Sequence, residues 1–145
     1  GDGGAHYSAI CDASYPTYAL MHWARDRAAG RFSIAEIVHK MTGATAAIMG
    51  LDDRGVIAIG KQADLNVIDL ARLSLYAPEI HDDLPAGGKR LIQRAQGYVA
   101  TIKSGRVAYR EGEPTGELPG RLVRVQVFLP RAARARGRQQ QKLKG

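Results

Sequence analysis

The hydrophobic pattern of this 145-residue chain changes its period near Gly55, and this change constrains the fold more than any other feature. Before Gly55, apolar residues recur at helical spacing, as at Leu20, Trp23 and Ala24. After it, short runs rich in β-branched residues follow, with turn residues between them. Helices followed by strands predict either an α+β domain or the junction between two domains.

Two helices and a shorter one are predicted in the first part. Ser14 is a candidate cap for a helix that begins at Tyr15 and stops at Gly30. Ser33 and Glu36 have the spacing of a capping box, which predicts a helix from there to Gly43. A shorter helix over 45–49 would be closed by Gly50.

Several short strands are predicted in the second part. We expect strands over 56–59, 63–70 and 122–129, with a long surface loop over 71–97. The segments 98–103 and 106–110 predict a hairpin, because Ser104-Gly105 between them is a good two-residue turn.

The formal charge of +7 comes almost entirely from the C-terminal segment. Residues 130–145 hold six Lys and Arg and no acid, and removing these six from the 21 leaves 15 against 14 Asp and Glu. Such a tail is either a disordered, soluble extension or a contact for nucleic acid through its phosphates. It contains no aromatic residue for base stacking, and we favour the extension.

Cys11 is the single cysteine, so no disulfide can form within the chain, and a reducing, cytoplasmic compartment is expected. No apolar run approaches the roughly 20 residues of a membrane helix, so no membrane contact is expected.

Three stretches together resemble the C-terminal end of the amidohydrolase superfamily, in its D-aminoacylase-like branch. The first is the segment DGGAH at 2–6 with CDASYP at 11–16. The second is RGVIAIGKQADLNVIDL at 54–70, and the third is VATIKSGRVAYREGEPTGELPGRL at 99–122. Their order and spacing carry the resemblance, which covers about residues 1–124.

The resemblance implies a composite architecture. Residues 1–53 would be the last strand and helices of a metal-dependent hydrolase (β/α)8 barrel. Residues 54–124 would be C-terminal strands of a small β-sandwich, and 125–145 a basic, disordered tail.

The implied reaction is hydrolysis of an amide bond, as in an N-acyl-D-amino acid, with the help of a divalent metal, usually zinc. The family's catalytic carboxylate, which takes the proton of the attacking water, maps onto Asp2. Asp2 is therefore the candidate catalytic residue and a possible metal ligand, and His6 is a candidate substrate contact. The loop 3–14 holds no arginine, the residue with which some D-aminoacylases grip the substrate carboxylate.

The remaining metal ligands of the family have no counterpart in this chain. Its histidines show neither His-x-His nor His-x-x-x-His spacing; they are His6, His22, His39 and His81. One aspartate cannot hold catalytic zinc, so the chain by itself is expected to bind no metal and to be inactive. Its expected partners are the rest of the barrel or a second copy, which would cover apolar faces at Val67 or Ile57 and at Ile37 or Met41.

Other chemistry-bearing residues favour structural readings. Asp64, in the ADL turn, is expected to bind backbone amides at the entrance of a strand. The segment His81-Asp82-Asp83 is expected in a solvated loop, and Gly87-Gly88-Lys89-Arg90 lacks the Walker pattern of a phosphate loop. Three further residues stand in no catalytic or binding pattern, and structural roles are predicted for them as well. These are a buried thiol for Cys11, a turn cap for Asp12 and a core position for Trp23.

Overall fold

The structure, a computed structural model, describes residues 12–123, and residues 1–11 and 124–145 lie outside the described part. It opens with a continuous helical stretch formed by η1 (Asp12–Ser14), α1 (Tyr15–Tyr18) and the π-helix η2 (Ala19–Asp26). The predicted start at Tyr15 is confirmed. The Ser14 side chain makes no capping hydrogen bond, and the helix ends at Asp26, before the predicted Gly30.

The capping box predicted at Ser33 is confirmed at the start of α2 (Ile34–Met41). Ser33 Oγ accepts the Glu36 amide at 3.1 Å, and a Glu36 carboxylate oxygen accepts the Ser33 amide at 2.8 Å. These bonds from the backbone and hydroxyl of Ser33 lower the pKa of Glu36.

Gly43 was predicted to end this helix, but it begins α3 (Gly43–Ile48). The chain bends one residue earlier, at Thr42 (φ −125°, ψ −86°). Gly43 and Gly55 lie close together, since a Cβ on Gly55 would come within 3.2 Å of the Gly43 Cα and within 2.7 Å of the Ala46 Cβ. The glycine at 55 therefore permits the close approach of this loop to α3.

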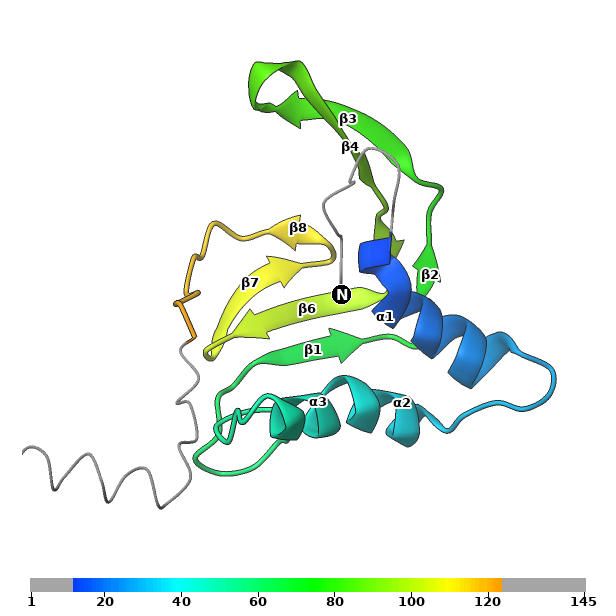
Figure 1. Cartoon of the computed structure of the whole chain (residues 1–145), viewed down its shortest axis with the longest axis vertical. Helices are drawn as coiled ribbons and strands as arrows, with labels where there is room; N and C mark the ends of the chain where they lie inside the picture. The colour runs from blue at the N-terminus through cyan, green and yellow to red at the C-terminus, as the bar shows by residue number, and fades with distance from the viewer. Residues whose placement is uncertain (1–11, 124–145) are drawn as a thin grey trace, which may run out of the picture.

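Four of the strands form an antiparallel sheet in the order β1-β6-β7-β8, with bounds β1 (Leu65–Ile68), β6 (Tyr98–Lys103), β7 (Arg106–Arg110) and β8 (Glu113–Pro114). The predicted β6–β7 hairpin is confirmed at both strands. Its turn residues Ser104 and Gly105 have φ of 52° and 77°, as a type I′ turn requires. Figure 1 shows α2 and α3 along the β1 side of this sheet.

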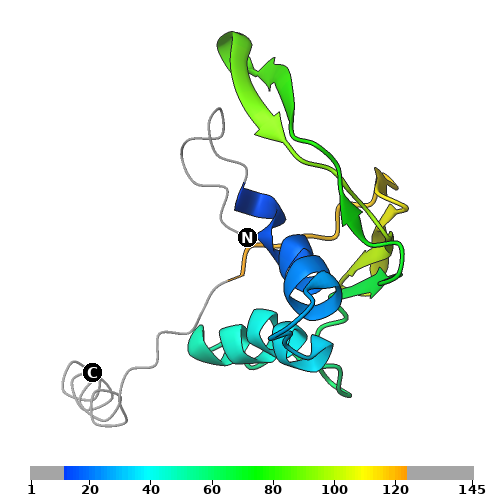
Figure 2. The ribbon, with the colours of Figure 1, turned by 90° about the vertical axis from the view of Figure 1, so that its right-hand side faces the viewer.

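The long loop predicted over 71–97 is wrong, because this segment contains four strands. β2 (Ser74–Leu75) pairs with β5 (Ala95–Gln96), and β3 (Glu79–Leu84) pairs with β4 (Gly88–Ile92) across the short helix η3 (Pro85–Gly87). The β3–β4 hairpin projects from the body as an arm (Figures 1 and 2). A bulge between His81 and Leu84 breaks the regular alternation of side chains along β3, by which a strand is recognised in a sequence.

The strand predicted over 56–59 is also wrong. Ile57 is 89% exposed and Ile59 fully exposed, and these residues form no ladder with any described strand. Gly55 and Gly60, with φ of 89° and 83°, bend the chain at both ends of the run. The strand predicted over 122–129 lies outside the described residues, except Leu122 and Val123, which are not in a strand.

The core lies between the helices and the strands. It is formed by Leu20, Ile37 and Leu73, which are 5%, 8% and 0% exposed. Val67 and Ile57 are exposed, as predicted. The prediction for the helix side is wrong, because Ile37 is buried in this core and Met41 packs against it, partly buried.

The prediction of Trp23 as a core residue is wrong: its side chain is 36% exposed, with the Arg27 guanidinium 4.5 Å from its ring centroid. The wider π-helical turn changes which residues share the face of Leu20. None of the helices within residues 12–123 is long and apolar enough to cross a bilayer.

Replacing Leu73 by Ala should lower the free energy of unfolding by about 3 kcal/mol, because it leaves a cavity at a fully buried position. Urea denaturation followed by circular dichroism measures the change. Leu118→Ala, at a 94% exposed leucine, is the matched control and should change stability by less than about 0.5 kcal/mol. Equal effects of the two substitutions would contradict the assignment of the core.

Candidate functional site

The two residues predicted to act on the substrate, Asp2 and His6, lie outside the described residues, as does Cys11. The structure describes the segment that follows them. Asp12 is an exposed residue in the first turn of η1, and no side-chain hydrogen bond of Asp12 is found among residues 12–123. Its predicted role as a turn cap is therefore not seen there.

Hydrogen bonds tie this segment to the strands. The hydroxyl groups of Thr17 and Tyr98 lie 2.8 Å apart, and Thr17 is 6% exposed. Ser14 Oγ donates to the Gln93 side chain, between β4 and β5. The start of the helix is thus held by residues far away in the sequence.

Arg25 holds the end of this helix against the strand half. Its guanidinium donates to the carbonyl oxygens of Leu70 and Leu73 at 2.5 and 2.8 Å, and to both oxygens of Asp26 at 2.5 and 2.9 Å. The hydrogen bond from Arg25 lowers the pKa of Asp26, and the same bond raises the pKa of Arg25. This charge therefore binds backbone acceptors and is not directed at a substrate.

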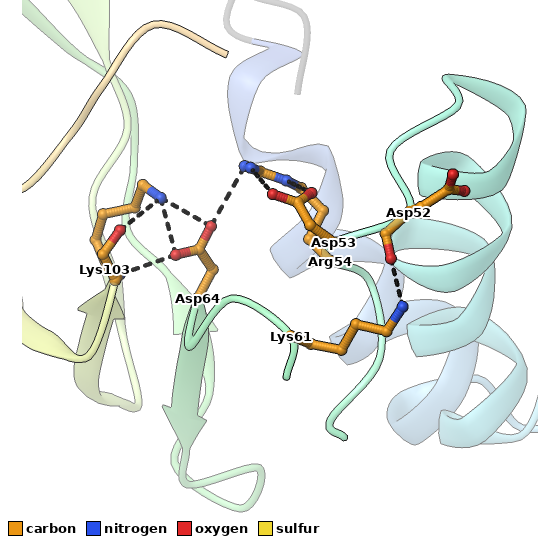
Figure 3. A network of polar contacts seen from close by, with 7 residues as sticks. Asp52, Asp53, Arg54, Lys61, Asp64 and Lys103 are labelled. Atoms are coloured by element: carbon orange, nitrogen blue, oxygen red, sulfur yellow. Dashed lines mark hydrogen bonds and ion pairs between the residues drawn. The ribbon is translucent and has the colours of Figure 1, made fainter. Parts of the chain in front are cut away.

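The densest polar network surrounds Asp64, just before β1 (Figure 3). Lys103 Nζ donates to both Asp64 oxygens at 2.9 Å, and the Ser104 amide donates to one of them at 2.9 Å. Arg54 approaches the other oxygen at 3.5 Å and forms a bidentate pair with Asp53 at 2.8 and 2.9 Å. The backbone amide bond predicted for Asp64 is confirmed.

The electrostatics of Asp64 favour a structural role. Burial raises its pKa, but the hydrogen bonds from Lys103 and Ser104 and the charges of Lys103 and Arg54 outweigh burial, so the pKa is lowered overall. A carboxylate held ionised by several donors is a poor proton acceptor. It joins the entrance of β1 to the β6–β7 turn.

The segment His81-Asp82-Asp83 is part of β3, not of a loop. Asp83 forms a bidentate pair with Arg90 at 2.7 and 2.5 Å, Asp82 lies 3.4 Å from the Lys89 ammonium, and the His81 ring lies 3.2 Å from the Glu79 carboxylate. Gly87 and Gly88 thus belong to a hairpin whose cations pair with its own acids.

The described residues do not fit a zinc site. No group of three or more His, Cys, Asp or Glu converges anywhere in residues 12–123. The His22 ring stacks on Tyr18 with centroids 5.1 Å apart, while His81 faces Glu79 on the hairpin. Catalytic zinc requires three convergent protein ligands, which this part of the chain does not supply.

A pocket of about 590 Å³ was not anticipated from the sequence. It lies where β2, β5 and the start of β6 approach the β7–β8 turn, and its wall includes Arg72, Arg94, Glu111 and Glu113. Two of these residues fall in the segment that was predicted to be a loop. A prediction from the sequence that residues 74–75 pair with 95–96 would have placed Arg72 and Arg94 side by side.

The family model described as the amidohydrolase family matches residues 1–109, about three quarters of the chain. The chain belongs to the amidohydrolase family. A protein named D-aminoacylase, from Alcaligenes xylosoxydans xylosoxydans, is 36% identical over 104 residues, which are 72% of this chain. The match covers 19% of that relative, so this amidohydrolase chain spans about a fifth of its length. No solved structure matches the chain.

Asp64→Asn should lower the free energy of unfolding by about 1–3 kcal/mol at pH 7, since it leaves Lys103 without its charged partner. The folded pKa of Asp64 is lowered, so this stabilisation is present above the unfolded pKa of about 3.9 and is lost as pH falls through the folded value. Urea unfolding from pH 7 to about 3 should show the two proteins converging at acid pH.

Asp82→Asn is the matched control, because the Asp82–Lys89 pair is exposed; we expect it to cost less than about 1 kcal/mol at pH 7. A difference between wild type and Asp64→Asn that stays constant down to acid pH would contradict the ionic role of Asp64.

Proposed function

We propose that this chain forms the C-terminal part of a metal-dependent hydrolase that cleaves the amide bond of N-acyl-D-amino acids. The family membership of residues 1–109 supports amide-type hydrolysis. The identity of 36% with a protein named D-aminoacylase supports the narrower substrate class, and this is the observation that carries the proposal.

Asp2 is the proposed catalytic residue, and His6 a proposed substrate contact. The carboxylate of Asp2 would take a proton from the attacking water and return it to the leaving nitrogen. The motif Asp2-Gly3-Gly4-Ala5-His6 supports this role, since it lies within the matched residues. In the proposed architecture these residues end the last barrel strand, at the face where barrel active sites lie.

We propose that the 145 residues do not catalyse the reaction by themselves. Residues 12–123 contain no set of convergent metal ligands, and their charged groups Arg25, Asp64 and Arg90 are committed to structural pairs. The metal ligands would come from the preceding barrel of an assembled enzyme.

The partner of this chain is proposed to be that barrel, or a second copy of the chain. Apolar side chains that a partner would cover are exposed at the end of α3 and in the following loop: Ile48, Met49, Val56, Ile57 and Ile59. Association with a partner would remove these apolar side chains from water and is therefore favoured.

No observation in the described part of the chain favours a non-catalytic nucleic-acid module. The basic residues on which that alternative depends lie at 131–144, outside the described residues. The comparisons give it no support.

A chimaera tests the proposal: residues 1–109 replace the matching stretch of the Alcaligenes D-aminoacylase. The chimaera with zinc should release D-amino acids from N-acetyl-D-amino acids. Asp2→Asn should lower kcat by about 10²–10⁴-fold, because the water loses its proton acceptor.

Asp12→Asn is the control, an exposed carboxylate in the following segment, and should change kcat less than about threefold. Metal content and circular dichroism verify folding of each protein. A folded, zinc-loaded chimaera without activity, or full activity in Asp2→Asn, would contradict the proposal.

A further inference from the structure

The pocket of about 590 Å³ combines two cations, two carboxylates and aromatic rings. Arg72 and Arg94 come from segments that flank the β2–β5 ladder. Glu111 and Glu113 come from the turn into β8, beyond β6 in the sheet. The two signs of charge therefore reach the pocket from different structural elements.

These four charges are not neutralised within the described part of the chain. No ion pair or side-chain hydrogen bond of Arg72, Arg94, Glu111 or Glu113 is found among residues 12–123. Other charges of the same sheet are paired, as in Arg106–Glu117 at 2.9 Å. The pocket thus presents both signs of charge and leaves both available to a ligand.

Hydrogen bonds hold the wall of the pocket in shape. The Tyr76 hydroxyl donates to the Gln96 side chain at 2.8 Å, and the Gln93 amide donates to the Tyr76 carbonyl at 2.9 Å. The Tyr98 hydroxyl is engaged with Thr17. The Tyr76 and Tyr109 rings, about half exposed, add apolar surface to the wall.

We propose that this pocket binds a small zwitterion with an aromatic or apolar side chain, namely a short peptide with free termini. Its carboxylate pairs with Arg72 and Arg94, since guanidinium groups bind carboxylates through two parallel hydrogen bonds. Its ammonium pairs with Glu111 and Glu113, and its side chain packs against the tyrosine rings. The volume falls within the usual range of small-ligand pockets. This binding goes beyond the proposed hydrolase activity and does not depend on it.

Calorimetry on the 145-residue chain tests the proposal with glycyl-phenylalanine as the probe. N-acetyl-glycyl-phenylalanine removes the ammonium, and glycyl-phenylalanine amide removes the carboxylate. Each capped peptide should bind about five- to tenfold more weakly than the free dipeptide, because one charged contact is lost. Equal affinity of all three peptides, or no binding of the free dipeptide up to about 10 mM, would overturn the proposal.

Two substitutions test which pocket residues bind the carboxylate and which bind the ammonium of the ligand. Arg94→Gln should weaken the free dipeptide and the acetylated peptide about fivefold and leave the amide unchanged, since only the first two carry a carboxylate. Glu113→Gln should weaken the free dipeptide and the amide and leave the acetylated peptide unchanged.

Arg106→Gln and Glu117→Gln are the matched controls, because this ion pair does not line the pocket. They should leave all affinities unchanged. Controls that weaken binding as much as the pocket variants would show nonspecific charge attraction and overturn the site. An inactive chimaera leaves this binding result unaffected, so the two proposals can fail separately.

Discussion

The corner between β1 and β2 holds the two halves of the molecule together. Leu73 is fully buried there against Leu20 and Ile37, so helices and strands share one small core. Gly97 permits this packing, because a Cβ at this position, where φ is 95°, would lie 2.7 Å from the Leu73 Cα. Arg25 adds part-buried hydrogen bonds to the Leu70 and Leu73 carbonyl groups of the same corner.

The opposite end of β1 is held by charge. Asp64 binds Lys103 and the Ser104 amide, which fixes the start of β1 against the β6–β7 turn. A four-residue strand thus has an apolar anchor after its last residue and an ionic anchor before its first. With both ends fixed, the register of β1 on β6 places Val67 on an exposed part of the sheet, 47% accessible to water.

Family membership and structure describe different parts of the chemistry. Asp2, the residue proposed for proton transfer, precedes the described residues. The acids and bases within residues 12–123 mostly stabilise turns and hairpins, as Asp64, Asp83 and Arg25 do. Ligand binding is proposed instead at charges that take part in no ion pair within residues 12–123, Arg72 and Arg94 beside the β2–β5 ladder and Glu111 and Glu113 at the β7–β8 turn.

Local interactions explain what could be predicted from the sequence. The Ser33–Glu36 capping box and the Ser104-Gly105 turn each involve residues close in the chain, and the structure contains both. The amide bond of Asp64 was also predictable, because it belongs to a recurrent turn. The family resemblance depended on the order of such segments, and the match over residues 1–109 confirms it.

Long-range pairing explains what could not be predicted. The β3–β4 arm was hidden because a bulge breaks its alternation, and Val56-Ile57-Ala58-Ile59 has strand composition but no partner strand. The pocket brings Arg72 and Arg94 near Glu111 and Glu113, which lie far from them in the chain. The sequence by itself determined the Ser33 capping box, the Ser104-Gly105 turn and the family. Only the tertiary structure decided which residues meet, since strand ladders and charge pairs depend on neighbours distant in the sequence.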